Sequence, residues 1–275
     1  MRMLIRFFRR LLGRPVPPRK RKRTMVILST LLLAIPLAGQ TPPEPESQIQ
    51  DNSFLIEEAY NQDPGVVQHI QTFARATRGG DWLYTFTQEW PAPTIKHQLS
   101  YTLAMANVSG EQGVGDVALN YRYQWIGDAD ARVAVSPRLT LLLPTGNERR
   151  GLGSGGTGLQ VMLPASTVLT PTLVAHWNLA ATTIPSKHTH NITAGQSFVW
   201  LAKPRFNALV ETLWSRTSDR AGHASQLTVS PGIRWSYDFP SKLQIVPGLA
   251  FPIANHGGGK SVFVYLSFEH PFISN

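Results

Sequence analysis

Cysteine is absent from the 275 residues, and its absence excludes disulfide bonds and thiolate metal ligands. Long apolar runs are scarce too: Met25 to Ala38 has 14 residues, well short of the roughly 20 that a helix needs to cross a membrane. Beyond residue 65 the helical period of 3.6 residues is also missing. A helical membrane protein and a disulfide-stabilised domain are therefore both excluded.

The apolar run near the N-terminus has the features of a secretion signal. Arg19 to Arg23 are all basic and precede it, and the small residues Ala38 and Gly39 follow. A basic region, a short apolar region and small residues at the end are typical of a secretory signal peptide. We therefore predict that residues 1–40 are a signal peptide that is removed from the mature protein.

The positive charge of the chain belongs mostly to this segment. The full sequence has a net charge of +9, but 10 of its 26 basic residues precede Met25. From Thr41 onward, 16 basic residues face 17 acidic ones. The mature chain is therefore close to neutral, and the sequence predicts no nucleic-acid partner.

Residues 41–65 differ in composition from the rest of the mature chain. Their first part is rich in proline and glutamate, which favours disorder. Ser53 followed by Phe54, Leu55 and Ile56 is compatible with a short amphipathic helix that begins at a serine cap. We expect this segment to lie on the periplasmic side, against the mouth of the domain formed by residues 66–272.

Alternation with a period of two dominates after residue 65, as expected for strands with two different faces. Leu227 and Val229, for example, alternate with Thr228 and Ser230. The pattern predicts twelve strands, at residues 66–77, 81–91, 95–107, 114–127, 131–144, 156–166, 169–184, 188–203, 205–217, 223–238, 241–254 and 260–272. Apolar faces rich in Trp and Tyr near the strand ends suit interfacial girdles.

The connections between these strands alternate in length. Tight turns are expected at residues 91–94, 127–130, 165–168, 203–205 and 239–241. Longer polar loops are expected at residues 108–113, 145–155, 185–191, 218–225 and 255–259. Short turns at one end and longer loops at the other are the arrangement of outer-membrane barrels. The sequence therefore predicts an all-β fold, a closed antiparallel transmembrane β-barrel of about 12 strands.

Three prolines lie inside the predicted strands, on their apolar faces: Pro137, Pro231 and Pro247. Proline has no N–H group to donate to a neighbouring strand, and a closed barrel has no free edge. Each of these prolines is therefore expected to mark a bulge or a kink.

The closing strand, residues 260–272, places Val262, Val264 and Leu266 on one face and ends in the aromatic Phe272. This pattern suits a strand with lipid on one side and a polar lumen on the other. We expect outer-membrane lipids as surroundings, and the barrel-assembly machinery as a partner that binds the strand ending at Phe272. The predicted location is the bacterial outer membrane.

Several segments resemble a known family when they are taken as a set. They are NSFLIEEAYNQDPGVVQHI (52–70), YTFTQEWP (84–91), GDVALNYRY (115–123), PRL (137–139) and LPTG (143–146). Together they are similar to outer-membrane transporters of the "MetA-pathway of phenol degradation" family. The resemblance implies a membrane barrel that passes small, aromatic or apolar compounds. It implies no agreed substrate and no functional residue.

Charged and titratable residues with lumen-facing parity are the candidate site. By period two they are Glu89, Arg122, Arg138, His176, Glu211, Arg234 and Glu269. Two arrangements remain open: they line a narrow, water-filled passage and set its selectivity, or they pair and fill the barrel. The first is favoured, with Arg122 and Arg138 as a basic track along one wall.

Other chemistry finds little support in the sequence. His188, His190, His223 and His256 fall in predicted loops without accompanying carboxylates, so no metal and no cofactor is expected. A G-x-S-x-G motif is missing, and His176 has no evident serine partner. We predict a pore or transporter for small solutes and no enzyme. The alternatives are a structural or adhesive barrel and, less favoured, a lipid-modifying enzyme.

Overall fold

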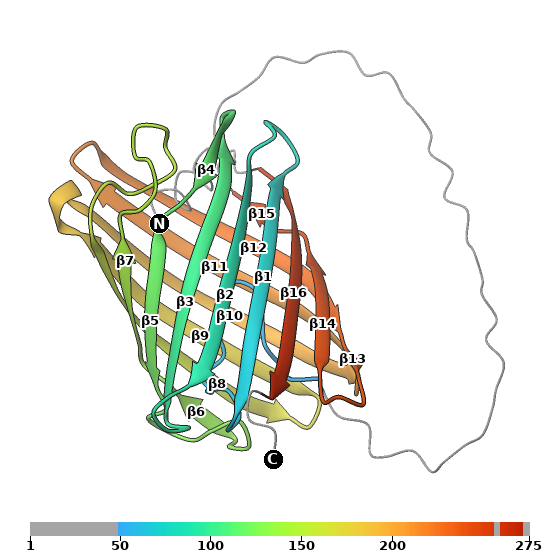
Figure 1. The fold of residues 1–275 in the computed structure, drawn as a ribbon. Helices are drawn as coiled ribbons and strands as arrows, with labels where there is room; N and C mark the ends of the chain where they lie inside the picture. The colour runs from blue at the N-terminus through green and yellow to red at the C-terminus, as the bar shows by residue number, and fades with distance from the viewer. Residues whose placement is uncertain (1–48, 256–258, 272–275) are drawn as a thin grey trace, which may run out of the picture.

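The computed structural model describes residues 49–255 and 259–271, which form a barrel of antiparallel strands (Figure 1). The strands are β1 (Val66–Ala76), β2 (Trp82–Pro91), β3 (His97–Val108), β4 (Glu111–Val114), β5 (Val117–Tyr123), β6 (Val133–Val135), β7 (Arg138–Leu143), β8 (Gly158–Thr170), β9 (Leu173–Ile184), β10 (Thr189–Lys203), β11 (Phe206–Asp219), β12 (Gly222–Trp235), β13 (Tyr237–Asp238), β14 (Gln244–Ala250), β15 (Ile253–Ala254) and β16 (Ser261–Pro271). The predicted signal peptide, residues 41–48, His256 and Phe272 lie outside the described residues.

Pairing of the first and last long strands closes the barrel. β1 pairs with β16 from Val66↔Pro271 to Ala76↔Ser261, and β14 pairs with both β16 and β12. Four crossings are each built from two pieces, β4 with β5, β6 with β7, β12 with β13, and β14 with β15. The barrel therefore has twelve crossings, and the predicted fold class is confirmed.

The two faces of the wall differ as the alternation predicted. Outward side chains such as Leu179 and Val161 are 58% and 54% exposed, which suits contact with lipid. Inward neighbours such as Asn120 and Thr182 are buried and polar. In the part of the chain that the structure describes, no helix is long and apolar enough to cross a membrane.

Each of the three strand prolines lies where one ladder of hydrogen bonds is interrupted. Pro137 separates β6 from β7. Pro231 pairs with Val210 on one side, but on its other side β12 changes partner from β15 to β14. Pro247 pairs with Leu266, while its opposite side lies between the β13 and β12 pairings. The missing N–H of each proline thus faces a gap in the sheet.

The connections at the end opposite the start of β1 and the finish of β16 are shorter than expected. β11 and β12 form a hairpin in which Asp219 pairs with Gly222, and β9 and β10 are joined by the short 3₁₀ turn η1 (Pro185–Lys187). The loops predicted at residues 185–191 and 218–225 were therefore wrong. Polar residues at these places remain in strands, because strand ends that project beyond the hydrocarbon need no apolar side chains. The longest connection at this end joins β7 to β8.

The segment before β1 also differs from the expectation. Residues 53–60 form no helix, and residues 49–65 run through the interior of the barrel instead of lying outside its mouth (Figure 1). Wall side chains bind the backbone groups that a helix would use for its own hydrogen bonds. Tertiary contacts therefore override the local helical preference.

Candidate functional site: a plug inside the barrel

Residues 49–65, here called the plug segment, cross the lumen from one wall to another. At the start, the Ile49 N–H donates to the Pro204 carbonyl in the turn between β10 and β11, at 2.8 Å. At the end, the Val66 N–H donates to the Asp63 carbonyl at the first residue of β1. Both points lie at the end of the barrel where β1 begins and β16 finishes (Figure 1). The plug segment therefore enters and leaves at the same end.

Glu211 on β11 is the anchor of the first half. Its Oε1 accepts hydrogen bonds from three consecutive backbone N–H groups, those of Phe54 (3.0 Å), Leu55 (2.6 Å) and Ile56 (3.1 Å). The Glu211 side chain is fully buried. A carboxylate that accepts several N–H groups forms strong charge-assisted bonds. One wall residue thus fixes the backbone of three plug residues.

Arg234 on β12 and Asn207 on β11 bind carbonyl groups just before this point. The Arg234 guanidinium donates to the carbonyls of Asn52 and Gln50, and the Asn207 amide donates to the Gln50 carbonyl at 3.0 Å. The guanidinium also lies 5.4 Å from the ring centroid of Tyr265. Acidic and basic wall residues therefore bind donors and acceptors of the plug backbone, respectively.

The second half follows the wall of β9, β8 and β5. The Asn178 side chain accepts from the Glu57 N–H at 2.7 Å and donates to the Glu57 carbonyl at 2.8 Å. The Ala59 N–H donates to the Ser166 hydroxyl, and Gln124 donates to the Ala59 carbonyl, both at 2.8 Å. These contacts again involve the backbone, so they fix the path of the plug segment whatever its side chains are.

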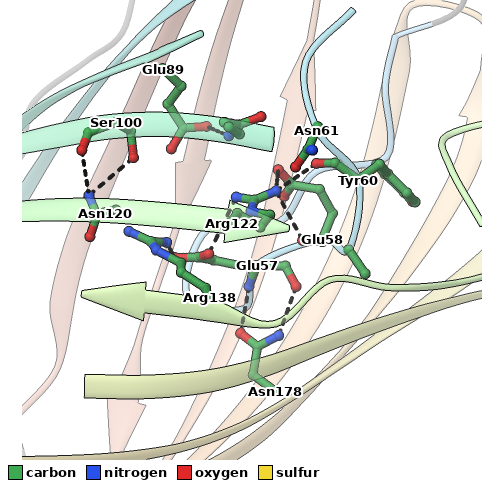
Figure 2. A network of polar contacts seen from close by, with 12 residues as sticks. Glu57, Glu58, Tyr60, Asn61, Glu89, Ser100, Asn120, Arg122, Arg138 and Asn178 are labelled. Atoms are coloured by element: carbon green, nitrogen blue, oxygen red, sulfur yellow. Dashed lines mark hydrogen bonds and ion pairs between the residues drawn. The ribbon is translucent and has the colours of Figure 1, made fainter. Parts of the chain in front are cut away.

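An ion cluster joins the plug segment to the wall at Glu57 (Figure 2). The Glu57 carboxylate pairs with Arg122 at 3.4 Å and with Arg138, and it lies between the two. Arg122 also donates to the Tyr60 carbonyl at 2.6 Å. Arg122 and Arg138 are partners in the β5–β7 register, so their charges would be adjacent without Glu57. Arg122 also lies 3.9 Å from Glu58, so the two arginines face two plug carboxylates and no free basic track remains.

A tyrosine stabilises the bend of the plug segment on itself. The Tyr60 hydroxyl donates to Asp51 Oδ2 at 2.5 Å. Burial, followed by the nearby Asp51 carboxylate, raises the pKa of Tyr60 above its usual range. The hydroxyl therefore remains a donor at any physiological pH, and the contact persists.

Apolar side chains of the plug segment fit places where the wall has glycine. The Phe54 ring packs on Phe263 and Tyr265, at centroid distances of 5.6 and 5.3 Å. A Cβ on Gly232 or Gly248 would lie 2.7 or 2.6 Å from this ring. Similarly, a Cβ on Gly195 would lie 2.3 Å from Ile56 Cδ1. The wall and the plug segment are thus complementary in shape as well as in hydrogen bonding.

The seven predicted lumen residues all connect to the plug segment. Five of them contact it directly, and the other two reach it through a glutamine. Glu211, Arg234, Arg122, Arg138 and His176 bind it directly. Glu89 accepts from Gln98, whose Oε1 accepts from the Gln62 N–H. Glu269 accepts from Gln68, which in turn accepts from the Gln62 amide.

Sequence reasoning missed the neutral half of this site. Gln98, Gln124, Ser166 and Asn178 all bind the plug segment through polar side chains. Their inward parity was readable, because each alternates with outward residues. Glu57 was missed for another reason: residues 41–65 show no alternation that would place them inside a barrel.

Ser166 is the serine partner that the sequence did not reveal for His176. Its hydroxyl lies 2.8 Å from His176 Nδ1, and His176 Nε2 lies 3.0 Å from the Asp51 carbonyl. The same hydroxyl accepts the Ala59 N–H, and both side chains are buried beneath the plug segment. A nucleophile needs access to its substrate, so this pair serves as a fixing point and not as a catalytic dyad.

Among the described residues, the loop histidines do not assemble a metal site. His188 is bonded to Arg220, a cation that competes with metal binding. Within residues 49–255 and 259–271, no group of three or more His, Asp or Glu side chains is placed to hold a metal ion. His256 lies outside these ranges.

Comparison with solved structures places the barrel among known folds. The NanC porin matches with a TM-score of 0.54 at 9% identity, over 73% of this chain and 98% of that chain. The KdgM porin in complex with disordered oligogalacturonate matches with a TM-score of 0.46 at 7% identity, over 76% and 99% of the two chains. These identities show similarity of fold alone. The fold is that of bacterial outer-membrane barrels, and the outer membrane is where the protein resides.

Comparison of sequences defines the family. The search of curated proteins gave no significant match. A family model described as "Putative MetA-pathway of phenol degradation" matches residues 62–264, which is most of the chain and nearly the whole barrel. The chain belongs to this family, the "MetA-pathway of phenol degradation" family.

Proposed function

We propose that the protein is an outer-membrane pore for small solutes, and that the plug segment restricts its lumen. Passage then requires the plug segment to shift away from part of the wall. The barrel supplies the route across the membrane, and the buried residues that bind the plug segment control how wide the route is. The protein carries out no chemistry on the solute in this proposal.

The arrangement around Glu57 is the observation that supports this function most directly. A single plug carboxylate lies between two wall arginines that are register partners on β5 and β7. Its side chain remains 30% exposed, whereas that of Arg122 is 4% exposed. Water or a polar solute therefore reaches this ion pair more easily than the contacts of the fully buried Glu211. Loss of the pair would remove one anchor of the second half of the plug segment, whose backbone contacts with Asn178, Ser166 and Gln124 would remain.

The side chains that line the lumen and the family description both bear on the class of solute. Part of the interior is apolar, with Ala74, Leu83, Ala106 and Phe263 buried in one cluster on the side of β1, β2, β3 and β16. The family description refers to phenol degradation. We therefore propose small aromatic or apolar compounds as solutes. Their path would run between a polar half and an apolar half of the lumen.

Planar-bilayer recordings of the refolded protein test the proposal. Wild-type protein should show low conductance, and deletion of residues 49–62 should give steady single-channel steps. Glu57→Ala should lie between these limits, because only one of several anchors is lost. In vesicles, the deletion variant should also speed entry of phenol relative to a sugar of larger size.

A matched control uses an ion pair outside the lumen. Glu111 pairs with Arg150 at 2.5 Å near the tips of the connections, with both side chains about half exposed. The conductance of the Glu111→Ala variant should equal that of the wild-type protein. A folded deletion variant that remains closed to ions and to phenol would refute the pore and favour a structural barrel.

A further inference from the structure

Gln71, Gln88 and Gln196 are polar residues on the lipid-facing side of the long strands. Gln71 on β1 and Gln88 on β2 each accept a hydrogen bond from a tyrosine hydroxyl, that of Tyr84 or Tyr101, at 3.0 Å. Gln196, at the centre of β10, is exposed on the same outer face. Within the part of the chain that the structure describes, its amide has no hydrogen-bond partner. A polar group that faces hydrocarbon without a partner is unfavourable and therefore calls for a function.

The other two glutamines each have a tyrosine beside them, whereas Gln196 has an open groove. The groove has a volume of about 480 Å³ and lies across β8, β9, β10 and β11. Aromatic and aliphatic side chains form most of its lining, among them Trp177, Trp214, Leu163 and Leu179. An apolar pocket of this size with a few polar groups is typical of small-molecule sites.

The register shows which group is missing. Gln88 is the direct cross-strand partner of Tyr101, and Gln196 is the direct cross-strand partner of Thr212. A threonine at this place leaves open the space that the tyrosine ring fills beside Gln88. A molecule with an aromatic ring and a hydroxyl group would fill this space and donate to the Gln196 amide oxygen.

We propose that the groove around Gln196 is a binding site for a small aromatic molecule with a hydroxyl group. The hydroxyl donates to the Gln196 side chain, and the ring packs between Trp177 and Trp214. The site is on the outer wall, so its existence does not depend on whether the lumen conducts.

The groove is also close to the plug segment. Gly195 and Asn178 line it, and these two residues lie against Ile56 and Glu57 on the other side of the wall. Only the thickness of the sheet therefore separates a molecule in the groove from two plug residues.

Fluorine NMR on the full-length protein in detergent tests the site, with 4-fluorophenol as the probe. Wild-type protein should broaden the signal in a saturable way. Gln196→Leu should weaken the apparent affinity on the order of fivefold to tenfold, as expected for loss of one hydrogen bond in an apolar site. Gln88→Leu, whose amide already has a tyrosine partner, should leave binding unchanged.

Two further measurements decide between occupants. Thr212→Tyr should abolish binding while the barrel stays folded, because the new ring fills the groove as Tyr101 does beside Gln88. The probe 4-fluorotoluene, which has no hydroxyl, should bind weakly to all variants. Equal binding of both probes would show that the groove holds apolar chains of any kind. Equal binding of 4-fluorophenol to wild type and Gln196→Leu would show simple partitioning into the micelle. Either result would overturn the proposal.

Discussion

At the scale of single residues, Glu57 has the role that the sequence could least have assigned to it. Its carboxylate pairs with both Arg122 and Arg138, which are register partners and therefore lie side by side. Of the two arrangements considered for these arginines, pairing describes their contacts better than a charged wall does. Their partner, however, is a residue of the plug segment and not one of the lumen acids on other strands.

A mutant cycle measures the coupling in this cluster. Glu57→Ala should destabilise the barrel by about 3 kcal/mol, since it removes the carboxylate that pairs with Arg138 and leaves Arg122 with Glu58 alone, 3.9 Å away. Arg122→Ser with Arg138→Ser should also be destabilising, because Glu57 then has no partner. The triple variant should cost less than the sum of the two. Equilibrium unfolding in detergent gives these free energies, and simple additivity would show that the three residues act independently.

At the scale of the elements, the plug segment and the wall are matched like two packed layers of a core. Phe54 lies against Gly232 on β12 and Gly248 on β14, and Ile56 lies against Gly195 on β10. These glycines leave the space that the plug side chains occupy. Glycine weakens a strand by offering no side chain to pack, so its presence at these three places is explained by the close approach of the plug.

Filling one of these places should loosen the plug segment without opening the barrel wall. In Gly248→Val, the new side chain would meet the Phe54 ring, because even a Cβ would lie 2.6 Å from it. Conductance in planar bilayers should rise in this variant. Adding Phe54→Ala should relieve the clash and restore part of the wild-type stability. If Gly248→Val conducts no better than wild type, Phe54 does not hold the plug segment in place.

The difference between wall and plug explains what the sequence could predict. Outward Leu227 and Val229 alternate with inward Thr228 and Ser230, and β12 was placed within a few residues. Such alternation is a local signal, because lipid and lumen act on successive residues. The path of Phe54 to Ile56 depends instead on Glu211, more than 150 positions away. No local pattern encodes a contact of this separation.

At the scale of the whole molecule, the closed barrel places the start of β1 and the finish of β16 at one end. β1 begins and β16 finishes at the same end, because they pair in antiparallel along their whole length. The tight turns include Pro204 at this end, where the plug segment also enters. We predict that this end faces the periplasm in the outer membrane, because outer-membrane barrels have short periplasmic turns. The plug segment is then reached from the periplasmic side.

The absence of cysteine from the chain allows a direct test of this orientation. Ala221, in the β11–β12 hairpin, and Ala129, in the connection between β5 and β6, are both exposed and lie at opposite ends of the barrel. Single Ala221→Cys and Ala129→Cys variants can therefore be compared on intact cells with a maleimide that does not cross membranes. Ala221→Cys should be labelled at once, and Ala129→Cys only after the outer membrane is permeabilised. Because both positions are exposed in the folded chain, a difference in labelling reports the side of the membrane and not local burial. Labelling of Ala129→Cys on intact cells would place the plug entrance at the cell surface and reverse the proposed direction of access.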